Sequence, residues 1–242
     1  GRSRRCEAPR RMKADKAERI YAMKKIRVAV IGYGRSGRDI HKHLLEQLPE
    51  QYALAGFVDQ DSQRRAMIRR ETGLEAMRDY TELFCRQAEI DLVVNASFTQ
   101  DHARISKALL EQGFSVLSEK PAAKTVEAFD GLLESAAKSG AEYLVFQQYR
   151  FSPAYQKIKA CIASGVLGDI LQIDLRYDNF SRRWDWQTLQ ACDAGSLRNT
   201  GPHPVDHALD LMGFPEAAGD GPHALCAHLR RRRGLCEADP TG

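Results

Sequence analysis

A lysine in the stretch SVLSEKPAAK (115–124) stands where its charge can do chemistry. The apolar run before it predicts a strand, which places Lys120 at the carboxyl end of that strand, the edge where open α/β sheets bind ligands. Pro121 restricts the backbone of Lys120 to extended conformations and so limits the directions that its ammonium group can take. An ammonium group held there can polarise a hydroxyl or carbonyl oxygen, or exchange a proton with it. A solvated lysine on a surface loop is the alternative interpretation.

Three glycines in GYGRSG (32–37) follow the G-x-G-x-x-G pattern of dinucleotide-binding loops. An apolar run precedes them, an amphipathic stretch follows, and Asp59 ends the next apolar run. In this context Gly32 makes the turn, Gly34 lets the backbone approach a pyrophosphate, and Gly37 lets the helix pack closely on the strand. The helix N-terminus then offers N–H groups to the phosphates. The pattern predicts a dinucleotide site.

The residue at the end of the second apolar run indicates which dinucleotide the site takes. A carboxylate at Asp59 accepts hydrogen bonds from a ribose diol and repels a 2′-phosphate, so it favours NAD over NADP. Arg64 and Arg65 are close by in the sequence and weaken this preference, so NADP stays possible. Capping of the following helix is the alternative role for Asp59.

Strand-like and helix-like stretches alternate over residues 24–148, which predicts an α/β fold with a doubly wound parallel sheet. The expected strands are 25–32, 52–59, 91–97, 114–119 and 143–148, and the expected helices are 36–48, 61–72, 80–87, 100–112 and 125–139. Further along we expect a helix over 152–168, a strand over 169–178, whose apolar and polar residues alternate, and a short helix over 203–213.

The predicted organisation has four parts: a basic disordered tail (1–22), a Rossmann domain (23–148), a partial substrate and oligomerisation domain (149–215) and an irregular tail (216–242). The first tail has a net charge of +5 and the last is neutral, which leaves −1 for the body. The body is therefore not expected to bind nucleic acid. No apolar run reaches the roughly 18 residues of a membrane span. Six cysteines without paired spacing indicate reduced thiols in a cytoplasmic protein.

Several stretches together resemble successive blocks of the Gfo/Idh/MocA oxidoreductases, over about residues 24–214. They are IRVAVIGYGRSG, VDQD, DLVVNASFTQDHARISKALLEQGFSVLSEKPAAKT and QQYRFSPAYQKIKACIASGVLGDI. The resemblance implies a Rossmann domain followed by an α/β (α+β) domain with a large open sheet, which covers the substrate and often mediates homo-oligomers. It also implies a nicotinamide cofactor and a sugar, inositol or related polyol as the substrate.

The resemblance assigns roles to individual residues. Lys120 matches the family's catalytic lysine beside the nicotinamide, and His203 matches its proton-transfer histidine. Asn199 stands where the family usually has an aspartate and brings no negative charge. The predicted catalytic set is thus Lys120, His203 and Asn199. The predicted cofactor-binding set is Gly32, Gly34, Arg35, Ser36, Gly37, Asp59, Ser97, His102 and Glu119.

Three residues are expected at the substrate: Arg150, Trp184 and Trp186. Tryptophan faces stack on sugar C–H surfaces, although anchoring a long loop to the core is an equal alternative. For Arg150 the alternative is a surface position at a helix start. His203 and His207 are four residues apart on an expected helix, but a metal site needs a third ligand and none is evident nearby, so no metal is predicted.

Family members continue with more strands beyond the part that this chain resembles, so the second domain is expected to be incomplete, by C-terminal truncation or frameshift. Two functions remain open. One is an NAD-dependent oxidoreductase acting on CH–OH groups, which Lys120 and His203 favour. The other is a non-catalytic NAD-binding protein or an inactive fragment of such an enzyme, which Asn199 and the missing strands favour.

Overall fold

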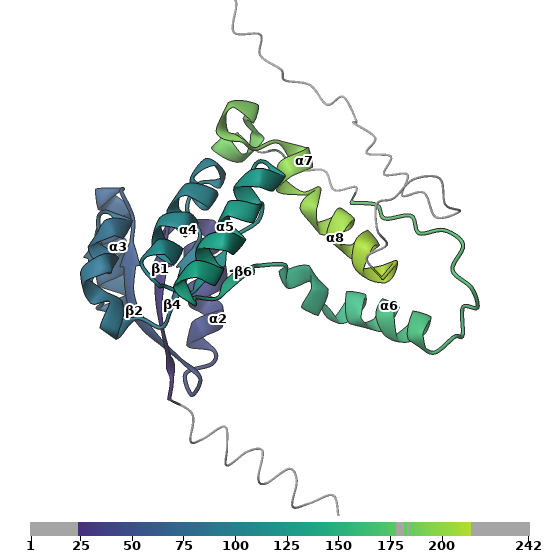
Figure 1. Cartoon of the computed structure of the whole chain (residues 1–242), viewed down its shortest axis with the longest axis horizontal. Helices are drawn as coiled ribbons and strands as arrows, with labels where there is room; N and C mark the ends of the chain where they lie inside the picture. The colour runs from purple at the N-terminus through teal and green to yellow at the C-terminus, as the bar shows by residue number, and fades with distance from the viewer. Residues whose placement is uncertain (1–23, 178–181, 183, 214–242) are drawn as a thin grey trace, which may run out of the picture. The chain divides into compact units, whose positions relative to one another are not determined.

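The computed structural model describes residues 24–177, 182 and 184–213. The chain divides into two compact units, Gly1–Phe146 and Gln147–Gly242 (Figure 1). The two predicted tails, 1–22 and 216–242, lie outside the described residues. None of the helices described is long and apolar enough to cross a bilayer.

The described part of the first unit contains one sheet of parallel strands in the order β3-β2-β1-β4-β5-β6. The strands are β1 (Ile26–Ile31), β2 (Tyr52–Val58), β3 (Ala76–Met77), β4 (Leu92–Asn95), β5 (Val116–Ser118) and β6 (Tyr143–Val145). This sheet confirms the predicted doubly wound α/β class. Because every neighbouring pair is parallel, the carboxyl ends of all these strands lie at one edge of the sheet.

Helical segments connect the strands of the first unit. They are η1 (Arg35–Lys42), α2 (His43–Glu46), α3 (Ser62–Thr72), η2 (Tyr80–Glu89), η3 (Thr99–Asp101), α4 (His102–Glu111) and α5 (Val126–Ser139). Side-chain caps mark their starts: Asp61 accepts a hydrogen bond from Gln63 N before α3, and Thr125 accepts one from Ala128 N before α5. Gly140 ends α5 in the left-handed conformation that glycine adopts readily.

The strand β1 shows why the sheet's sequences are almost continuously apolar. Val28 and Val30 belong to one buried cluster, which includes Ile68 of α3, whereas Ala29 and Ile31 belong to a second cluster with the apolar residues of α4 and α5. The helices α4 and α5 pack side by side (Figure 1). Since both faces are covered, both sets of alternating side chains have to be apolar.

The helix after the glycine loop differs from the prediction. The sequence predicts one α-helix over 36–48 with Ile40, Leu44, Leu45 and Leu48 on a shared face, but η1 is a π-helix and only α2 is α-helical. Leu44 and Leu48 are 43% and 44% exposed. The wider π turn changes the angular spacing of the side chains, so a pattern of 3.6 residues no longer describes the buried face. Instead η1 buries His41.

In the second unit the helical segments are η4 (Gln148–Phe151), α6 (Pro153–Ala163), η5 (Trp186–Thr188), η6 (Gln190–Cys192), α7 (Ser196–Asn199) and α8 (Pro202–Leu211). The predicted strand over 169–178 is wrong for its described part, because residues 169–177 form no strand and are mostly exposed. An alternating pattern becomes a strand only beside another strand that takes its backbone hydrogen bonds. The described part of this unit has no such strand.

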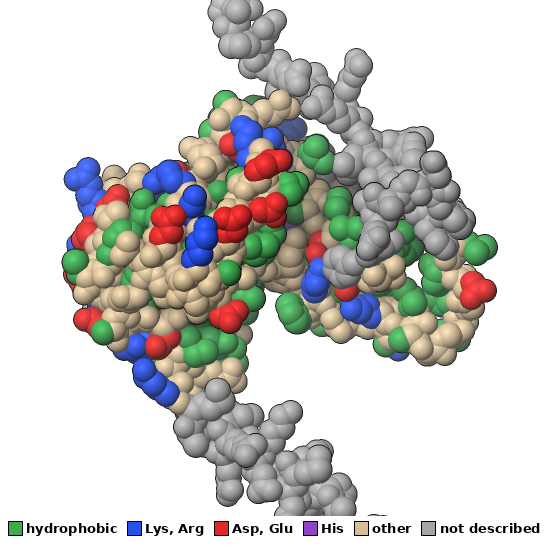
Figure 2. All heavy atoms as spheres, in the orientation of Figure 1, with side chains coloured by type: hydrophobic (Ala, Val, Ile, Leu, Met, Phe, Trp, Pro, Cys, Tyr) green, Lys and Arg blue, Asp and Glu red, His purple; other side chains and the backbone are tan. Residues whose placement is uncertain are grey.

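Charged side chains of both signs are interspersed on the first unit, on the face shown in Figure 2. Several of them form ion pairs within one helix, such as Lys107 with Glu111 in α4 and Lys138 with Glu134 in α5. This face therefore carries no large patch of a single sign of the kind that binds nucleic acid.

Candidate functional site: a dinucleotide loop and a lysine at one sheet edge

The glycine loop follows β1, and each glycine has a different environment. Gly32 has a φ of +87°, and a Cβ atom on it would lie 2.3 Å from the carbonyl oxygen of Ala96. A Cβ atom on Gly37 would lie 1.7 Å from the carbonyl oxygen of Gly32. By contrast, among the described residues a Cβ atom on Gly34 would meet only Arg64 Nη1, at 3.8 Å. The first and third glycines thus permit the tight fold of the loop, and the middle one borders open space.

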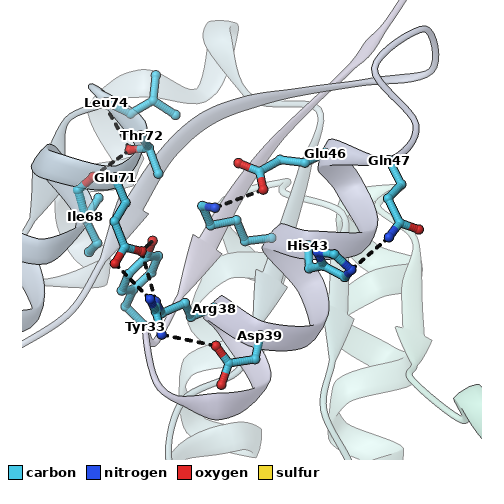
Figure 3. A network of polar contacts seen from close by, with 11 residues as sticks. Tyr33, Arg38, Asp39, His43, Glu46, Gln47, Ile68, Glu71, Thr72 and Leu74 are labelled. Carbon is cyan, nitrogen blue, oxygen red and sulfur yellow. Dashed lines mark hydrogen bonds and ion pairs between the residues drawn. The ribbon is translucent and has the colours of Figure 1, made fainter.

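A polar network that the sequence did not reveal holds this loop against α3 (Figure 3). Tyr33, which is 2% exposed, donates its backbone N–H to Asp59 Oδ2 at 2.7 Å and its hydroxyl to Glu71 Oε2 at 2.8 Å. Arg38 donates to both carboxylate oxygens of Glu71 at 2.9 Å. These partners are 26 to 38 residues apart, so no local sequence pattern marks them. The network fixes the position of the loop before any ligand binds.

This network gives a pH-dependent prediction. The hydrogen bonds from Arg38 and then Tyr33 lower the pKa of Glu71 from 4.5 to about 2. A lowered folded-state pKa means that the stabilisation is present above pH 4.5 and is lost as the pH falls toward 2. Glu71→Gln should therefore lower the Tm at pH 7, and its difference from wild type should shrink below pH 4.5, as thermal melts would show. Glu50→Gln, at an exposed site, is the matched control. A difference that stays constant with pH would contradict the assignment.

Asp59 directly follows β2 beside the glycine loop and is 8% exposed. Its carboxylate accepts hydrogen bonds from Tyr33 N and from Asp61 N, the latter at 2.9 Å. The cap of α3 is Asp61, so the alternative role that the sequence left open for Asp59 is not the one seen. Arg64 Nη1 lies 3.6 Å from Asp59 Oδ2, whereas Arg65 donates to the backbone carbonyls of Asp59 and Gln60. Of the two arginines, Arg64 is the one beside the carboxylate.

Arg35 and Ser36 are the first residues of η1, directly after the loop. Backbone N–H groups in the first turn of a helix have no helical acceptor, and they are a common site for phosphate groups. Together with Gly34 they form the side of the loop on which a pyrophosphate is expected. Their part in cofactor binding stays a prediction.

Lys120 follows β5, and the predicted residues Ser97, His102 and Glu119 lie around the ends of β4 and β5. Lys120 is half-buried and forms a cis peptide bond with Pro121. Ser97 donates its hydroxyl to Asn95 Oδ1 at 2.7 Å. His102 and Glu119 are 2% and 6% exposed, and their polar atoms contact other groups of this chain. The first unit therefore brings the glycine loop and the lysine to one edge of the sheet.

The other two predicted catalytic residues belong to the second unit. Asn199 ends α7 and His203 lies in the first turn of α8, so the helix is interrupted between them. His203 is 6% exposed, and its ring lies 4.3 Å from that of Tyr149. His207 stacks on Tyr155 at 3.8 Å and contacts the hydroxyl of Tyr177 through Nδ1 at 3.2 Å. Burial lowers the pKa of His207, which favours its neutral form.

The predicted substrate residues have unequal surroundings. Arg150 makes two hydrogen bonds to the carboxylate of Asp206 in α8, at 2.7 and 2.6 Å, so it links η4 to α8. Trp184 is 83% exposed, and Trp186 begins η5 and is half-buried. Within the described residues, no three histidine, cysteine or acidic side chains gather as a metal site would require. The roles of these residues at a substrate stay predictions.

A parallel sheet with a glycine loop after its first strand and an acidic residue after its second defines a Rossmann domain that binds a dinucleotide. The sequence model described as "Oxidoreductase family, NAD-binding Rossmann fold" matches residues 26–147, and the family's C-terminal domain model matches 155–238. The chain belongs to the Gfo/Idh/MocA oxidoreductase family, and its first domain binds NAD. The second match shows that the resemblance continues to residue 238, so the prediction that it ends near residue 214 is wrong.

Individual relatives agree with this assignment. The chain is 30% identical to inositol 2-dehydrogenase 2 of Saccharopolyspora erythraea, over 88% of this chain and 59% of that protein. It is 27% identical to scyllo-inositol 2-dehydrogenase (NADP(+)) IolW of Bacillus subtilis, over 79% of this chain and 53% of that protein. The chain thus spans only a little over half the length of these two relatives.

Solved structures show the same fold. An NAD-binding protein from Listeria innocua superposes with a TM-score of 0.71 at 22% identity, over 78% of this chain and 55% of that one. The WlbA dehydrogenase from Chromobacterium violaceum, solved with NADH and UDP-GlcNAcA, has a TM-score of 0.56 at 26% identity, over 61% of this chain and 42% of that one.

Proposed function

We propose that this protein transfers a hydride between NAD and a hydroxyl or carbonyl carbon of a sugar, inositol or related polyol. The observation that carries the proposal is the position of Lys120, half-buried at the carboxyl end of β5 in the sheet that carries the glycine loop. The two inositol dehydrogenases among the relatives support the choice of substrate class. The activity is proposed for the whole protein, and this chain contains at least the cofactor-binding domain that the activity needs.

The residues divide the chemistry between them. A bound NAD would supply the acceptor for a hydride from the carbon that bears the hydroxyl group. The N–H groups at Gly34, Arg35 and Ser36 would hold its pyrophosphate, and Asp59 would hold its adenosine ribose. The ammonium group of Lys120 stabilises the substrate oxygen as charge develops on it. His203 takes the hydroxyl proton, for which an imidazole is suited near neutral pH. Asn199 hydrogen-bonds a substrate hydroxyl without adding a charge.

The second candidate is an NAD-binding protein without turnover, and Asn199 favours it because an amide cannot take a proton as the family's usual aspartate can. One experiment separates the two. NAD binding to the 242-residue chain is measured by fluorescence, and absorbance at 340 nm is followed with a panel of polyols and sugars. Binding with turnover supports the oxidoreductase, and binding without turnover on any member supports the second candidate. Failure to bind NAD would contradict both. Light scattering on the same sample shows whether this chain by itself forms the homo-oligomer that is expected of a full-length family member.

The cofactor preference gives a separate prediction. We expect NAD to bind more tightly than NADP, because the Asp59 carboxylate repels a 2′-phosphate. Asp59→Asn removes the charge and keeps an acceptor oxygen for only one of the two N–H groups, because Tyr33 N donates to Oδ2 and Asp61 N to Oδ1. This variant should narrow the preference by about tenfold, and Arg64→Ala should widen it by a similar factor because it removes the nearby positive charge. Fluorescence titration with both cofactors measures the change. Equal or tighter NADP binding by the wild-type chain would overturn the prediction.

A further inference from the structure

We propose that two buried histidines, His41 and His102, are positioning residues that hold Lys120 by binding the residues on either side of it. His41 contacts Glu119, the residue before Lys120, and His102 contacts Pro121, the residue after it. Neither histidine is within the Lys120 segment, since His41 comes from η1 and His102 begins α4. The inference deepens the proposed function and rests on it for the role of Lys120 in turnover.

The contact before Lys120 involves a buried histidine–carboxylate pair. His41 Nε2 lies 3.1 Å from Glu119 Oε1, and the two side chains are 4% and 7% exposed. The other oxygen of Glu119 accepts the backbone N–H of Lys120 at 3.3 Å. The ring of Phe146 packs on His41 at 4.5 Å. Burial is the largest single influence on the pKa of Glu119 and acts to raise it, but the hydrogen bond with His41 and the nearby His41, Lys120 and His102 together lower the pKa, so Glu119 remains a carboxylate that accepts from both partners.

The contact after Lys120 is made by a ring between two backbone carbonyls. His102 Nδ1 lies 2.8 Å from the carbonyl oxygen of Pro121, and Nε2 lies 3.1 Å from that of Ser97. The ring thus links the segment after β5 to the segment after β4. The other end of this link is also fixed, because Asn95, which is fully buried, donates to the carbonyl oxygen of His102 and accepts from the N–H and hydroxyl of Ser97.

His102 cannot donate a hydrogen bond to both backbone carbonyls at once. A carbonyl oxygen only accepts, and a neutral imidazole has one N–H donor, so a neutral ring can donate to one of the two. Burial lowers the pKa of His102 and favours this neutral form. The shorter contact assigns the proton to Nδ1, which donates to Pro121. The link to Pro121 is therefore the one that sets the position of Lys120, and the link to Ser97 is the weaker of the two.

This unequal pair suggests a matched set of variants. The amide nitrogen of asparagine takes the place of Nδ1 and keeps a donor for Pro121, whereas that of glutamine takes the place of Nε2 and keeps one for Ser97. His102→Asn should then preserve the placement of Lys120 better than His102→Gln, although both lose one contact. A role in general stability alone would not distinguish the two variants. His43→Phe, at an exposed histidine of α2, is the control.

The readout is the Lys120 signal in the 242-residue chain with 13C-dimethylated lysines, assigned by its absence in Lys120→Arg. Each spectrum is recorded with enough NAD to saturate that variant. We expect saturating NAD to shift the Lys120 signal in wild type and in His43→Phe. Most of that shift should remain in His102→Asn, and more than about half of it should be lost in His102→Gln. Equal losses in the asparagine and glutamine variants would overturn the inference.

A measurement on the wild-type chain covers the case in which the variants fold poorly. The 15N spectrum of His102 should show a protonated Nδ1 at neutral pH, and an unprotonated Nδ1 would overturn the assignment. The Lys120 signal also separates this inference from the proposed function. If Lys120→Ala retains turnover, the proposed catalytic role of Lys120 fails, while the Lys120 signal of the wild-type chain still reports whether the histidines position the lysine.

Discussion

Lys120→Ala is expected to lower turnover by about 10²- to 10³-fold, the range found when one group that stabilises a developing oxyanion is removed. The half-buried ammonium group has no substitute nearby in sequence, because Pro121 and Ala122 follow it and the Glu119 carboxylate is bound to His41. Cofactor affinity should change by no more than about threefold, since the phosphates are held by the glycine loop and η1 rather than by β5. Turnover and binding should therefore separate in this variant.

The measurement uses the polyol or sugar on which the wild-type protein shows turnover, with kcat from absorbance at 340 nm and NAD affinity from fluorescence. Lys124→Ala removes an exposed lysine four residues further on and is the matched control. Lys120→Arg keeps a positive charge but replaces the compact ammonium group by a larger planar guanidinium group that cannot take the same position, so it should restore little of the rate. Near wild-type turnover in Lys120→Ala would show that the lysine is not catalytic.

The fold of the first unit could be predicted because its strands are covered on both faces. A stretch such as 25–32 is nearly all apolar, and its place between amphipathic stretches identifies it as a strand. The strand β3 escaped prediction because two residues, Ala76 and Met77, show no periodicity. The predicted strand over 169–178 failed for a different reason. The alternation of apolar and polar residues in this segment is typical of a strand, but the sequence of the segment does not show whether a neighbouring strand is present to form hydrogen bonds with it.

In the site, as in the fold, residue types could be predicted from the sequence but their distant contact partners could not. The loop glycines, Asp59 and Lys120 were predicted as site residues from their local spacing. His41 was not predicted, because its partner Glu119 is 78 residues away. The cofactor-binding role of His102 stays a prediction, and its contacts with two backbone carbonyls were not foreseen. Such contacts depend on which loops the sheet brings together.

The second large effect is expected at Gly37. A Cβ atom there would overlap the backbone of Gly32, at 1.7 Å from its carbonyl oxygen and 2.9 Å from its carbonyl carbon. Neither atom can move without displacing the end of β1, which lies in the centre of the sheet. Gly37→Ala should therefore cost about 3 kcal/mol or more of unfolding free energy, at the upper end for overpacked sites. A fall in Tm of about 10 °C or more should accompany it.

Gly34→Ala is the informative comparison, because it adds the same methyl group to the same loop but should change NAD affinity rather than stability. Gly34 has a φ of −83°, which alanine adopts without strain, and the nearest described atom to its new Cβ would be Arg64 Nη1 at 3.8 Å. The Tm should stay within about 2 °C of wild type. NAD affinity should nevertheless fall by about tenfold or more, because the methyl group occupies the space through which a pyrophosphate approaches the backbone. Thermal melts and fluorescence titrations of the two variants decide the matter. If Gly34→Ala binds NAD as wild type does, the open side of the loop is not the phosphate site.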